Sequence, residues 1–252
     1  MDLICSSPKN RCHHLTQKKA IVLLSGGMDS STVAYMVKAE GYSIYPLNFN
    51  YGQRNRKEIQ ASQNIAKFLG TELKTLEIDL RQIGGSALTD SSIPVPENRQ
   101  EIIAGDVTVN EIPVSYVPFR NTILLSFAIA YAEVLEAEAV AIGANAIDYS
   151  GYPDCRPEYF EAMQKVAELG SKAGVLGNKI KILTPVLHMS KADIVARGIE
   201  LGVPYEDSWS CYQDKELACG RCDSCLLRIK AFHANNMMDP LQYDYYPIEY
   251  KI

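Results

Sequence analysis

Residues 20–31 read Ala-Ile-Val-Leu-Leu-Ser-Gly-Gly-Met-Asp-Ser-Ser, and this stretch decides the fold of the 252-residue chain. Its first five residues are apolar without polar alternation, which predicts a parallel strand buried on both faces. Gly26 and Gly27 then allow a tight turn and a close approach of the backbone to a ligand. Residues 29–40 carry apolar side chains at helical spacing. The stretch therefore predicts a strand, a glycine turn and a helix.

The turn has the chemistry of an anion site. A helix N-terminus offers unpaired N–H groups and the positive end of a dipole, which suit a phosphate. No lysine follows the glycines, as a Walker A loop would require. An ordinary βα turn with capping serines is the alternative, but Ser-Gly-Gly-x-Asp-Ser between strand and helix resembles the PP-loop of ATP pyrophosphatases, which activate substrates as adenylates. This resemblance implies that ATP contacts Leu24, Ser25, Gly26, Gly27, Met28, Asp29, Ser30, Ser31, Thr32, Val33 and Ala34.

The bulk composition favours a small-molecule enzyme. The chain is 47% hydrophobic and 22% charged, as is typical of soluble globular proteins. No apolar run approaches the roughly 18 residues that a membrane span needs. The net charge is −5, whereas a protein that grips nucleic acid shows a basic face. We expect neither a nucleic-acid nor a membrane partner.

The segment 1–18 lacks the apolar core of a signal peptide. We interpret it as a flexible N-terminal extension and expect a cytoplasmic protein. Because that compartment is reducing, the seven cysteines of the chain are not expected to form a disulfide framework. Metal binding is the better interpretation.

Strand and helix patterns alternate along the chain. Further strands are predicted at 43–49, 73–78, 139–143 and 180–183, and helices at 54–69, 119–136, 157–169 and from 191 to about 202. This alternation predicts an α/β fold with a doubly wound parallel sheet, whose ligands lie at the carboxyl ends of the strands. The long segments 82–117 and 144–156 lack such regularity, and long loops in compact domains are usually functional.

Four cysteines near the C-terminus have metal-ligand spacing. Cys211, Cys219, Cys222 and Cys225 lie within fifteen positions and can close a tetrahedral zinc site. An iron–sulfur cluster and four unconnected thiols are the alternatives. Without a fifth ligand the site is closed, so we expect one structural zinc ion per chain. It would fasten a C-terminal zinc-binding segment, 206–252, to an ATP-binding catalytic domain, 19–205.

Cys155 stands apart from this cluster, in a loop rich in turn residues. It is either a nucleophile or a residue that lines the pocket, and no histidine lies near it in sequence to act as a base. The absence of a neighbouring base favours the lining role.

Further signatures narrow the family. In order along the chain they are Phe-Asn-Tyr-Gly-Gln-Arg at 49–54, Ser-Ile-Pro-Val-Pro at 92–96, Val-Pro-Phe-Arg-Asn at 117–121, Asp-Tyr-Ser-Gly-Tyr-Pro-Asp-Cys-Arg at 148–156 and the cysteine tail. Together with the PP-loop, they resemble the 7-cyano-7-deazaguanine synthase family over roughly residues 19–236. The chain departs from that pattern at Asn50, where an acidic residue is common, and at Phe119, where glycine is common.

The resemblance implies an ATP-dependent ligase that converts 7-carboxy-7-deazaguanine and ammonia into the 7-cyano product. Asp29, Arg120 and Lys191 are then expected to be catalytic: Asp29 at the phosphates and Mg²⁺, Lys191 at the phosphate charge, and Arg120 at a carboxylate or phosphate. Arg54 could serve like Arg120. Asp148 or Asp154 would accept hydrogen bonds from the base, and Tyr149 or Tyr152 would stack on it.

Two other functions fit parts of the sequence. A PP-loop tRNA-modifying enzyme would adenylate a base in RNA, but it predicts a basic groove that the acidic balance of the chain disfavours. A non-enzymatic zinc module would leave the residue 24–31 loop without a role. Relatives often pair, so we also expect a homodimer.

Overall fold

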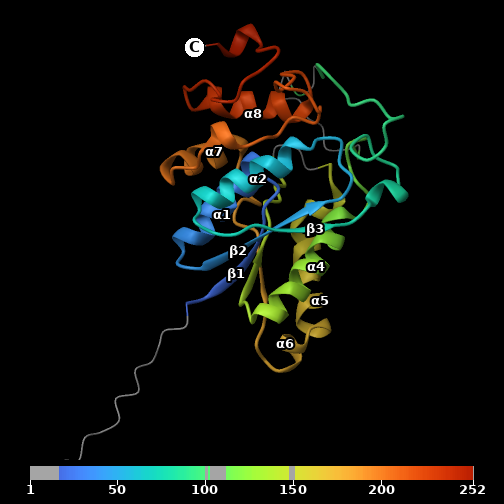
Figure 1. Cartoon of the computed structure of the whole chain (residues 1–252), viewed down its shortest axis with the longest axis vertical. Helices are drawn as coiled ribbons and strands as arrows, with labels where there is room; N and C mark the ends of the chain where they lie inside the picture. The colour runs from blue at the N-terminus through green and yellow to red at the C-terminus, as the bar shows by residue number, and fades with distance from the viewer. Residues whose placement is uncertain (1–16, 100–101, 103–111, 148–150, 252) are drawn as a thin grey trace, which may run out of the picture.

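A five-stranded parallel sheet forms the centre of the protein in the computed structural model, which describes residues 17–99, 102, 112–147 and 151–251 (Figure 1). The strands are β1 (Lys19–Leu23), β2 (Ser43–Asn50), β3 (Lys74–Glu77), β4 (Ala139–Ala141) and β5 (Lys181–Leu183). Their order is β3-β2-β1-β4-β5, and each neighbouring pair is parallel. The predicted doubly wound sheet is confirmed.

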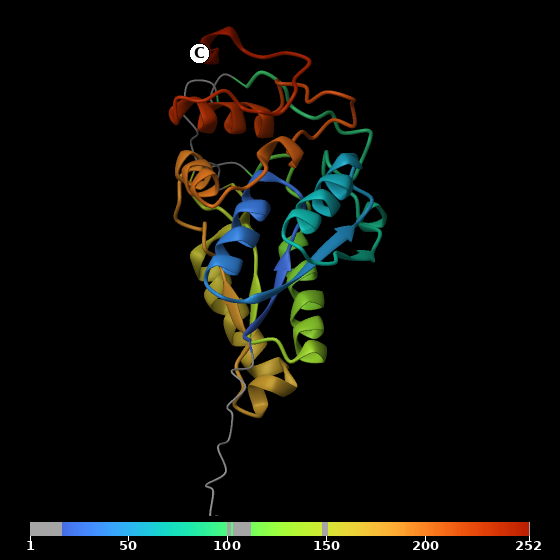
Figure 2. The same ribbon diagram turned by 60° about the vertical axis from the view of Figure 1, so that its left-hand side comes forward.

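Helices cover both faces of this sheet. They are α1 (Met28–Ala39), α2 (Lys57–Phe68), α4 (Arg120–Leu135), α5 (Pro157–Gly170), α6 (Lys172–Val175), α7 (Lys191–Glu200) and α8 (Asp223–Ala234). Short 3-10 turns are η1 (Leu80–Gln82), η2 (Pro153–Cys155), η3 (Tyr205–Asp207) and η4 (Ile248–Tyr250). Figure 2 shows α8 and the C-terminal residues, in red, beyond one end of the sheet and α6 at the other. Within the described ranges, no helix combines the length and apolar character that a membrane crossing requires.

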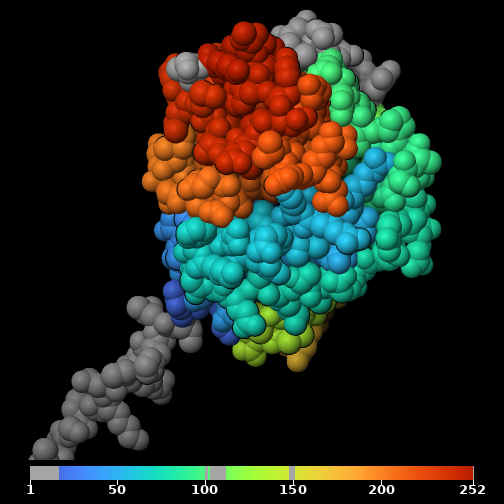
Figure 3. Space-filling view, turned by 45° about the horizontal axis from the view of Figure 1, so that its top comes forward, coloured from blue at the N-terminus to red at the C-terminus, as the bar shows by residue number. Residues whose placement is uncertain are grey.

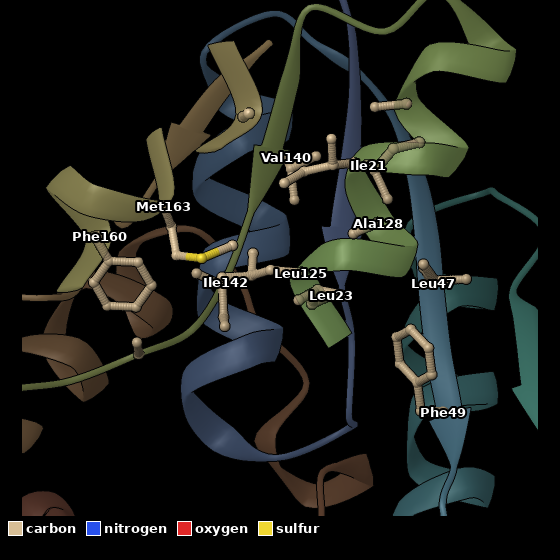
Figure 4. Close-up of a cluster of buried hydrophobic side chains, with 14 of the residues drawn as sticks. Ile21, Leu23, Leu47, Phe49, Leu125, Ala128, Val140, Ile142, Phe160 and Met163 are labelled. Carbon is tan, nitrogen blue, oxygen red and sulfur yellow. The ribbon is translucent and has the colours of Figure 1, made fainter. Parts of the chain in front are cut away.

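Strand β1 explains why its sequence lacks polar alternation. Ile21 and Leu23 point to one face, where they pack with side chains of β2, β4, α4 and α5 (Figure 4). Ala20, Val22 and Leu24 point to the other face and pack against α1, α2 and α7. A strand between two helix layers has no side exposed to water, so both sets of positions are apolar.

Some helix boundaries differ from the prediction. Helix α2 begins at Lys57 rather than at residue 54, because Asn55 is held outside the helix: its Oδ1 accepts from Lys57 N at 3.0 Å and its Nδ2 donates to Cys211 O at 2.7 Å. Helix α4 begins one residue after the predicted start, since Phe119 has a left-handed conformation with φ 58°. The predicted capping box of α7 is present between Ser190 and Asp193.

Helix α8 was not predicted from the sequence. It follows Cys222 directly and packs on α7. The long 82–117 segment also reaches it, because Glu97 pairs with Cys222 in a β-bridge and Asn98 N donates to Arg221 O at 2.8 Å. In Figure 3 the orange and red C-terminal residues form a continuous surface with the residues coloured cyan. The division at residue 205 stays a prediction.

Candidate active site at the carboxyl edge of the sheet

A cavity of about 290 Å³ opens at the carboxyl ends of β1 and β4. Here the chain changes direction across the sheet, from β1 outward to β2 and β3, then back to β4 and β5. Such a switch point leaves a crevice between the loops that follow the two strands. Tyr212, Ser224 and Leu227 from the C-terminal region line the same cavity. The C-terminal region therefore roofs the crevice.

Residues 24–31, which we term the phosphate loop, run from the end of β1 through the first turn of α1. Gly27 N donates to Ser25 Oγ at 3.3 Å, and the hydroxyl groups of Ser25 and Ser30 are 3.0 Å apart. Gly26 has φ +85°, and a Cβ there would lie 2.4 Å from Ser62 N and 2.6 Å from Glu58 O. Only glycine allows the loop to pack this closely on α2.

Asp29 and Lys191 form an ion pair beside this loop, although 162 positions separate them. Lys191 Nζ contacts Asp29 Oδ2. Asp29 Oδ1 is buried without a hydrogen-bond partner among the described residues. Both side chains line the cavity. The unpartnered oxygen fits a cation or donor that arrives with a ligand, because a buried carboxylate oxygen without a partner is costly.

The residues predicted to contact ATP fall into two groups. The cavity is lined by Leu24, Ser25, Gly27, Met28, Asp29 and Ser30. Gly26, Ser31, Thr32, Val33 and Ala34 do not line it. Thr32 Oγ1 instead lies 2.6 Å from Tyr205 OH, and Val33 and Ala34 belong to the core of that helix layer. The second group supports the position of α1.

The opposite part of the cavity, which we term the aromatic end, consists of Tyr51, Arg120, Tyr152 and Tyr212. Arg120 Nη1 donates to Tyr51 OH at 3.4 Å, and Tyr152 OH lies 2.9 Å from Ser115 Oγ. Burial raises the pKa of each of the three tyrosines, so they keep their protons at neutral pH. The aromatic end presents neutral rings and one cation.

The other predicted substrate residues have separate positions. Arg54 lines the cavity, and its Nη2 holds the 82–117 segment by donating to Asp90 O at 2.6 Å and Ile93 O at 2.8 Å. Asp154 does not line it; its Oδ2 accepts from Asn121 N at 2.9 Å, which secures the start of α4 beside Arg120. The predicted residues Asp148 and Tyr149 lie outside the described residues.

Cys155 lines the cavity as a buried thiol. Its Sγ accepts from Asn121 Nδ2 at 3.3 Å. Burial, together with the nearby Asp154, raises the pKa of the thiol to about 11. Since a nucleophilic cysteine needs a lowered pKa, these surroundings favour a lining role.

Several polar residues in the cavity lining were missed, among them Asn48 and Glu58. Asn48 Nδ2 donates to Leu24 O at 2.7 Å, while its Oδ1 is buried without a partner among the described residues. Glu58 lines the cavity from the first turn of α2. Asn48 is a polar residue in a mostly apolar strand, and that signal could have found it. Glu58 resembles an ordinary helix-surface glutamate in the sequence.

The four predicted cysteines form a candidate metal centre. The sulfur atoms of Cys211, Cys219, Cys222 and Cys225 all lie within 4.8 Å of one another, and the four residues are buried. Sulfur atoms around a tetrahedral zinc ion, each about 2.3 Å from it, have comparable separations. The donor set therefore fits a metal that prefers thiolates.

Backbone donors support the thiolate form of these cysteines. Gln213 N and Cys219 N each donate to Cys211 Sγ at 3.3 Å, and Cys222 N donates to Cys219 Sγ at 3.3 Å. Gly220 has φ +69°, and a Cβ there would lie 1.6 Å from Tyr245 O. This turn requires glycine for both reasons.

Comparison with known proteins identifies the relatives of this chain. The family model described as queuosine biosynthesis protein QueC matches residues 19–236. A 7-cyano-7-deazaguanine synthase of Thermosynechococcus vestitus is 53% identical over 234 residues, which cover 92% of this chain and 99% of that protein. The 7-cyano-7-deazaguanine synthase of Thermoplasma acidophilum is 52% identical over 237 residues, which cover 94% of this chain and 97% of that protein.

A solved structure is also similar at lower identity. The NMN synthetase of Francisella tularensis is 18% identical with a TM-score of 0.44, and the match covers 81% of this chain and 73% of that one.

Proposed function

This chain belongs to the family of queuosine biosynthesis protein QueC, and we propose that it converts 7-carboxy-7-deazaguanine and ammonia into 7-cyano-7-deazaguanine at the expense of ATP. The observation that carries the proposal is the cavity itself. It joins an anion-binding loop, with an unpartnered carboxylate oxygen of Asp29, to an end lined by aromatic rings and Arg120. The first part suits a nucleotide phosphate and the second a flat, anionic heterocycle.

The first step activates the carboxylate of the substrate. A carboxylate is a poor electrophile, because its oxygens are poor leaving groups. Attack of its oxygen on the α-phosphorus of ATP would form an acyl adenylate and release pyrophosphate, whose charge the phosphate loop and Lys191 would stabilise. Arg120 would hold the carboxylate by a charge-assisted hydrogen bond.

Ammonia then replaces the adenylate. Its nitrogen attacks the acyl carbon, AMP leaves, and loss of a proton gives the amide. A second adenylation, on the amide oxygen, would turn that oxygen into a leaving group. Departure of AMP and loss of the two N–H protons of the amide then yield the nitrile. Holding the reactants in one cavity can lower each barrier by up to about 7–11 kcal/mol.

The division of roles follows from the position of each residue. We propose that residues 24–34 bind ATP, with direct contacts from the side chains and backbone that line the cavity and support from those beneath it. Asp29 would also approach the Mg²⁺ that accompanies nucleotide phosphates. Arg54 and Tyr152 would contact the deazapurine. Asp154 would position Arg120 by holding the start of α4. We also propose that Asp148 accepts hydrogen bonds from the base and that Tyr149 stacks on it.

We propose that the cysteine centre holds one structural zinc ion. Four buried thiolates without an open ligand position are typical of closed zinc sites. Zinc would supply cross-linking of the C-terminal region and no chemistry at the substrate. Reduced thiols at these positions also support a cytoplasmic location.

A homodimer is supported by the outer face of α4. Phe127 is 42% exposed and Val134 is 77% exposed on this helix, and apolar side chains gathered on one surface are typical of protein contacts. Light scattering after gel filtration would distinguish a dimer of about twice the 28.0 kDa chain mass from a monomer.

The proposed reaction is tested by product analysis. The purified protein is incubated with ATP, Mg²⁺, ammonium and 7-carboxy-7-deazaguanine, and mass spectrometry should detect the nitrile. The tRNA-modifying alternative predicts a different result. The starting acid would remain unmodified, and RNA would be adenylated in a parallel reaction.

A further inference from the structure

Glu58 is a cavity carboxylate to which the proposed mechanism gives no role. It lies in the first turn of α2, four positions after Arg54, and it lines the cavity together with the aromatic end. Among the described residues, its carboxylate has neither a hydrogen bond nor an ion pair within bonding distance. Arg120 and Cys211 act on it only through longer-range interactions between charges, Arg120 by attraction and Cys211 by repulsion. The carboxylate is therefore available to a ligand.

The other acidic side chains near the cavity already have partners. Asp29 pairs with Lys191 at the phosphate loop. Asp154 accepts from Asn121 and lies outside the lining of the main cavity. Within the described ranges, Glu58 is thus the carboxylate of the cavity lining that has no ion pair.

The surroundings of Glu58 are suited to a flat ring. Tyr51, Tyr152 and Tyr212 line the same cavity as Glu58. The hydroxyl groups of Tyr51 and Tyr152 are already used by Arg120 and Ser115. The rings can pack on a heterocycle, but they leave its N–H edge to another acceptor.

A 2-amino-4-oxopyrimidine ring presents two adjacent N–H donors, one on the ring and one on the amino group. A carboxylate has two oxygens and can accept both bonds at once. From this match we propose that Glu58 reads the 2-amino edge of the deazapurine and so determines which base the enzyme accepts. This inference rests on the proposed function, which supplies the heterocycle.

The same contact would exclude adenine from this end. Beside its amino group adenine carries ring nitrogens with lone pairs, which a carboxylate repels. ATP would then occupy the phosphate loop with its base elsewhere. Selectivity between the two nucleobases follows from one side chain.

The electrostatics of the cavity agree with this role. Burial raises the pKa of Glu58 to about 8, and the nearby Arg120 offsets only part of this. Two N–H bonds from a ligand would favour the charged form and lower that pKa again. Without a ligand, the buried carboxylate of Glu58 lowers the stability of the fold, because it lacks hydrogen bonds. A bound ligand would supply those hydrogen bonds, as expected of a recognition residue.

Titration calorimetry of the full-length, zinc-loaded protein tests the inference without turnover. The two probes are 7-cyano-7-deazaguanine and its analogue without the 2-amino group. We expect the unmodified protein to prefer the amino compound, and Glu58→Gln to reduce that preference about 10- to 100-fold, as for a bidentate contact. Affinity for ATP should stay within about twofold. Glu161→Gln, on the exposed side of α5, is the matched control.

The outcomes separate this inference from the proposed function. If the unmodified protein binds neither deazapurine, both fail. If it discriminates and Glu58→Gln discriminates equally well, only the role of Glu58 fails. Weaker ATP binding with unchanged deazapurine selectivity would assign Glu58 to adenine and overturn the inference. Should Glu58→Gln fold poorly by circular dichroism, Glu58→Asp serves instead, with a partial loss of preference expected because its carboxylate is retracted.

Discussion

The phosphate loop and the aromatic end belong to one cavity but are assembled differently. Hydrogen bonds within the loop join residues two to five positions apart, such as Gly27 to Ser25 and Ser25 to Ser30. At the aromatic end, Arg120 meets Tyr51 across 69 positions and Tyr152 meets Ser115 across 37. A contiguous stretch carries one ligand site, whereas the other depends on the whole fold.

The two regions also differ in how the charge of their carboxylate is compensated. In the loop, the carboxylate of Asp29 is paired with Lys191, although Asp29 Oδ1 and Ser31 Oγ are buried without a hydrogen-bond partner among the described residues. At the aromatic end, Glu58 has a strongly raised pKa and no close partner among the described residues. The difference indicates that the aromatic end carries a stability cost for recognition, as functional sites often do.

Disruption of the metal centre should have the largest effect on stability and binding. The C-terminal residues that cover the cavity, including Tyr212, are held in place by this centre. We expect Cys222→Ser to lower both bound zinc and the melting temperature, because structural zinc contributes on the order of 10 kcal/mol to small domains. Deazapurine binding should be lost with the roof. Atomic absorption and thermal melting measure the two changes. Cys155→Ser, a buried thiol outside the centre, should retain the metal, and equal zinc content in both variants would contradict the ligand assignment.

Asp29→Asn should disable the phosphate loop while leaving the aromatic end intact. Removing the charge should lower kcat by about 100- to 1000-fold, the range observed for a lost electrostatic contact in a transition state. Nitrile formation followed by mass spectrometry gives the rate, and calorimetry should find deazapurine affinity unchanged. The exposed Asp214→Asn is the control. Rates near those of the unmodified enzyme would remove Asp29 from the site.

Glu58→Gln should stabilise the protein in a pH-dependent way. An ordinary glutamate titrates near 4.5 and folded Glu58 near 8, so between these values the unfolded chain is ionised while the folded chain keeps the proton. Stability supplied by this group is therefore complete below pH 4.5 and falls as the pH rises toward 8. The advantage of glutamine should grow over that window and level off at about 2 kcal/mol, an amount discounted for water in the cavity.

Urea unfolding at pH 5, 7 and 9 measures this difference. A constant gap between the two proteins across the three pH values would show that Glu58 titrates normally, and the contrast between the two ends of the cavity would disappear.

Phe119→Gly should have the smallest effect, a stabilisation of about 1 kcal/mol. Phe119 has φ 58° immediately before α4, a left-handed conformation that costs a side-chain-bearing residue about 1–2 kcal/mol. Its ring is 60% exposed, so little packing is lost. Thermal melting measures the gain, with Phe127→Gly, inside α4, expected to destabilise. A lower melting temperature for Phe119→Gly would mean that the ring makes stabilising contacts with another part of the chain or with a partner.

The sequence allowed the phosphate loop and the metal ligands to be predicted because both are short-range patterns. The loop needs two glycines and a helix start within a dozen residues, and the four cysteines lie within fifteen positions. The parallel sheet followed from the alternation of strand and helix patterns along the chain. The continuous apolar run of the first strand reflects burial on both of its faces. Helix α8 escaped prediction because Cys225, the last residue of the cysteine run, lies in its first turn, while Ala231 and Phe232 pack with Val195 of α7.

Tertiary structure alone decided which side chains share the cavity. It paired Asp29 with Lys191 across 162 positions, used Asp154 to secure α4 rather than to line the cavity, and turned Glu58 from an apparent surface residue into a cavity carboxylate. Local sequence records the conformations that a segment prefers. The residues that contact each polar group depend on strand order and on the path of distant loops. A short window of sequence does not contain that information.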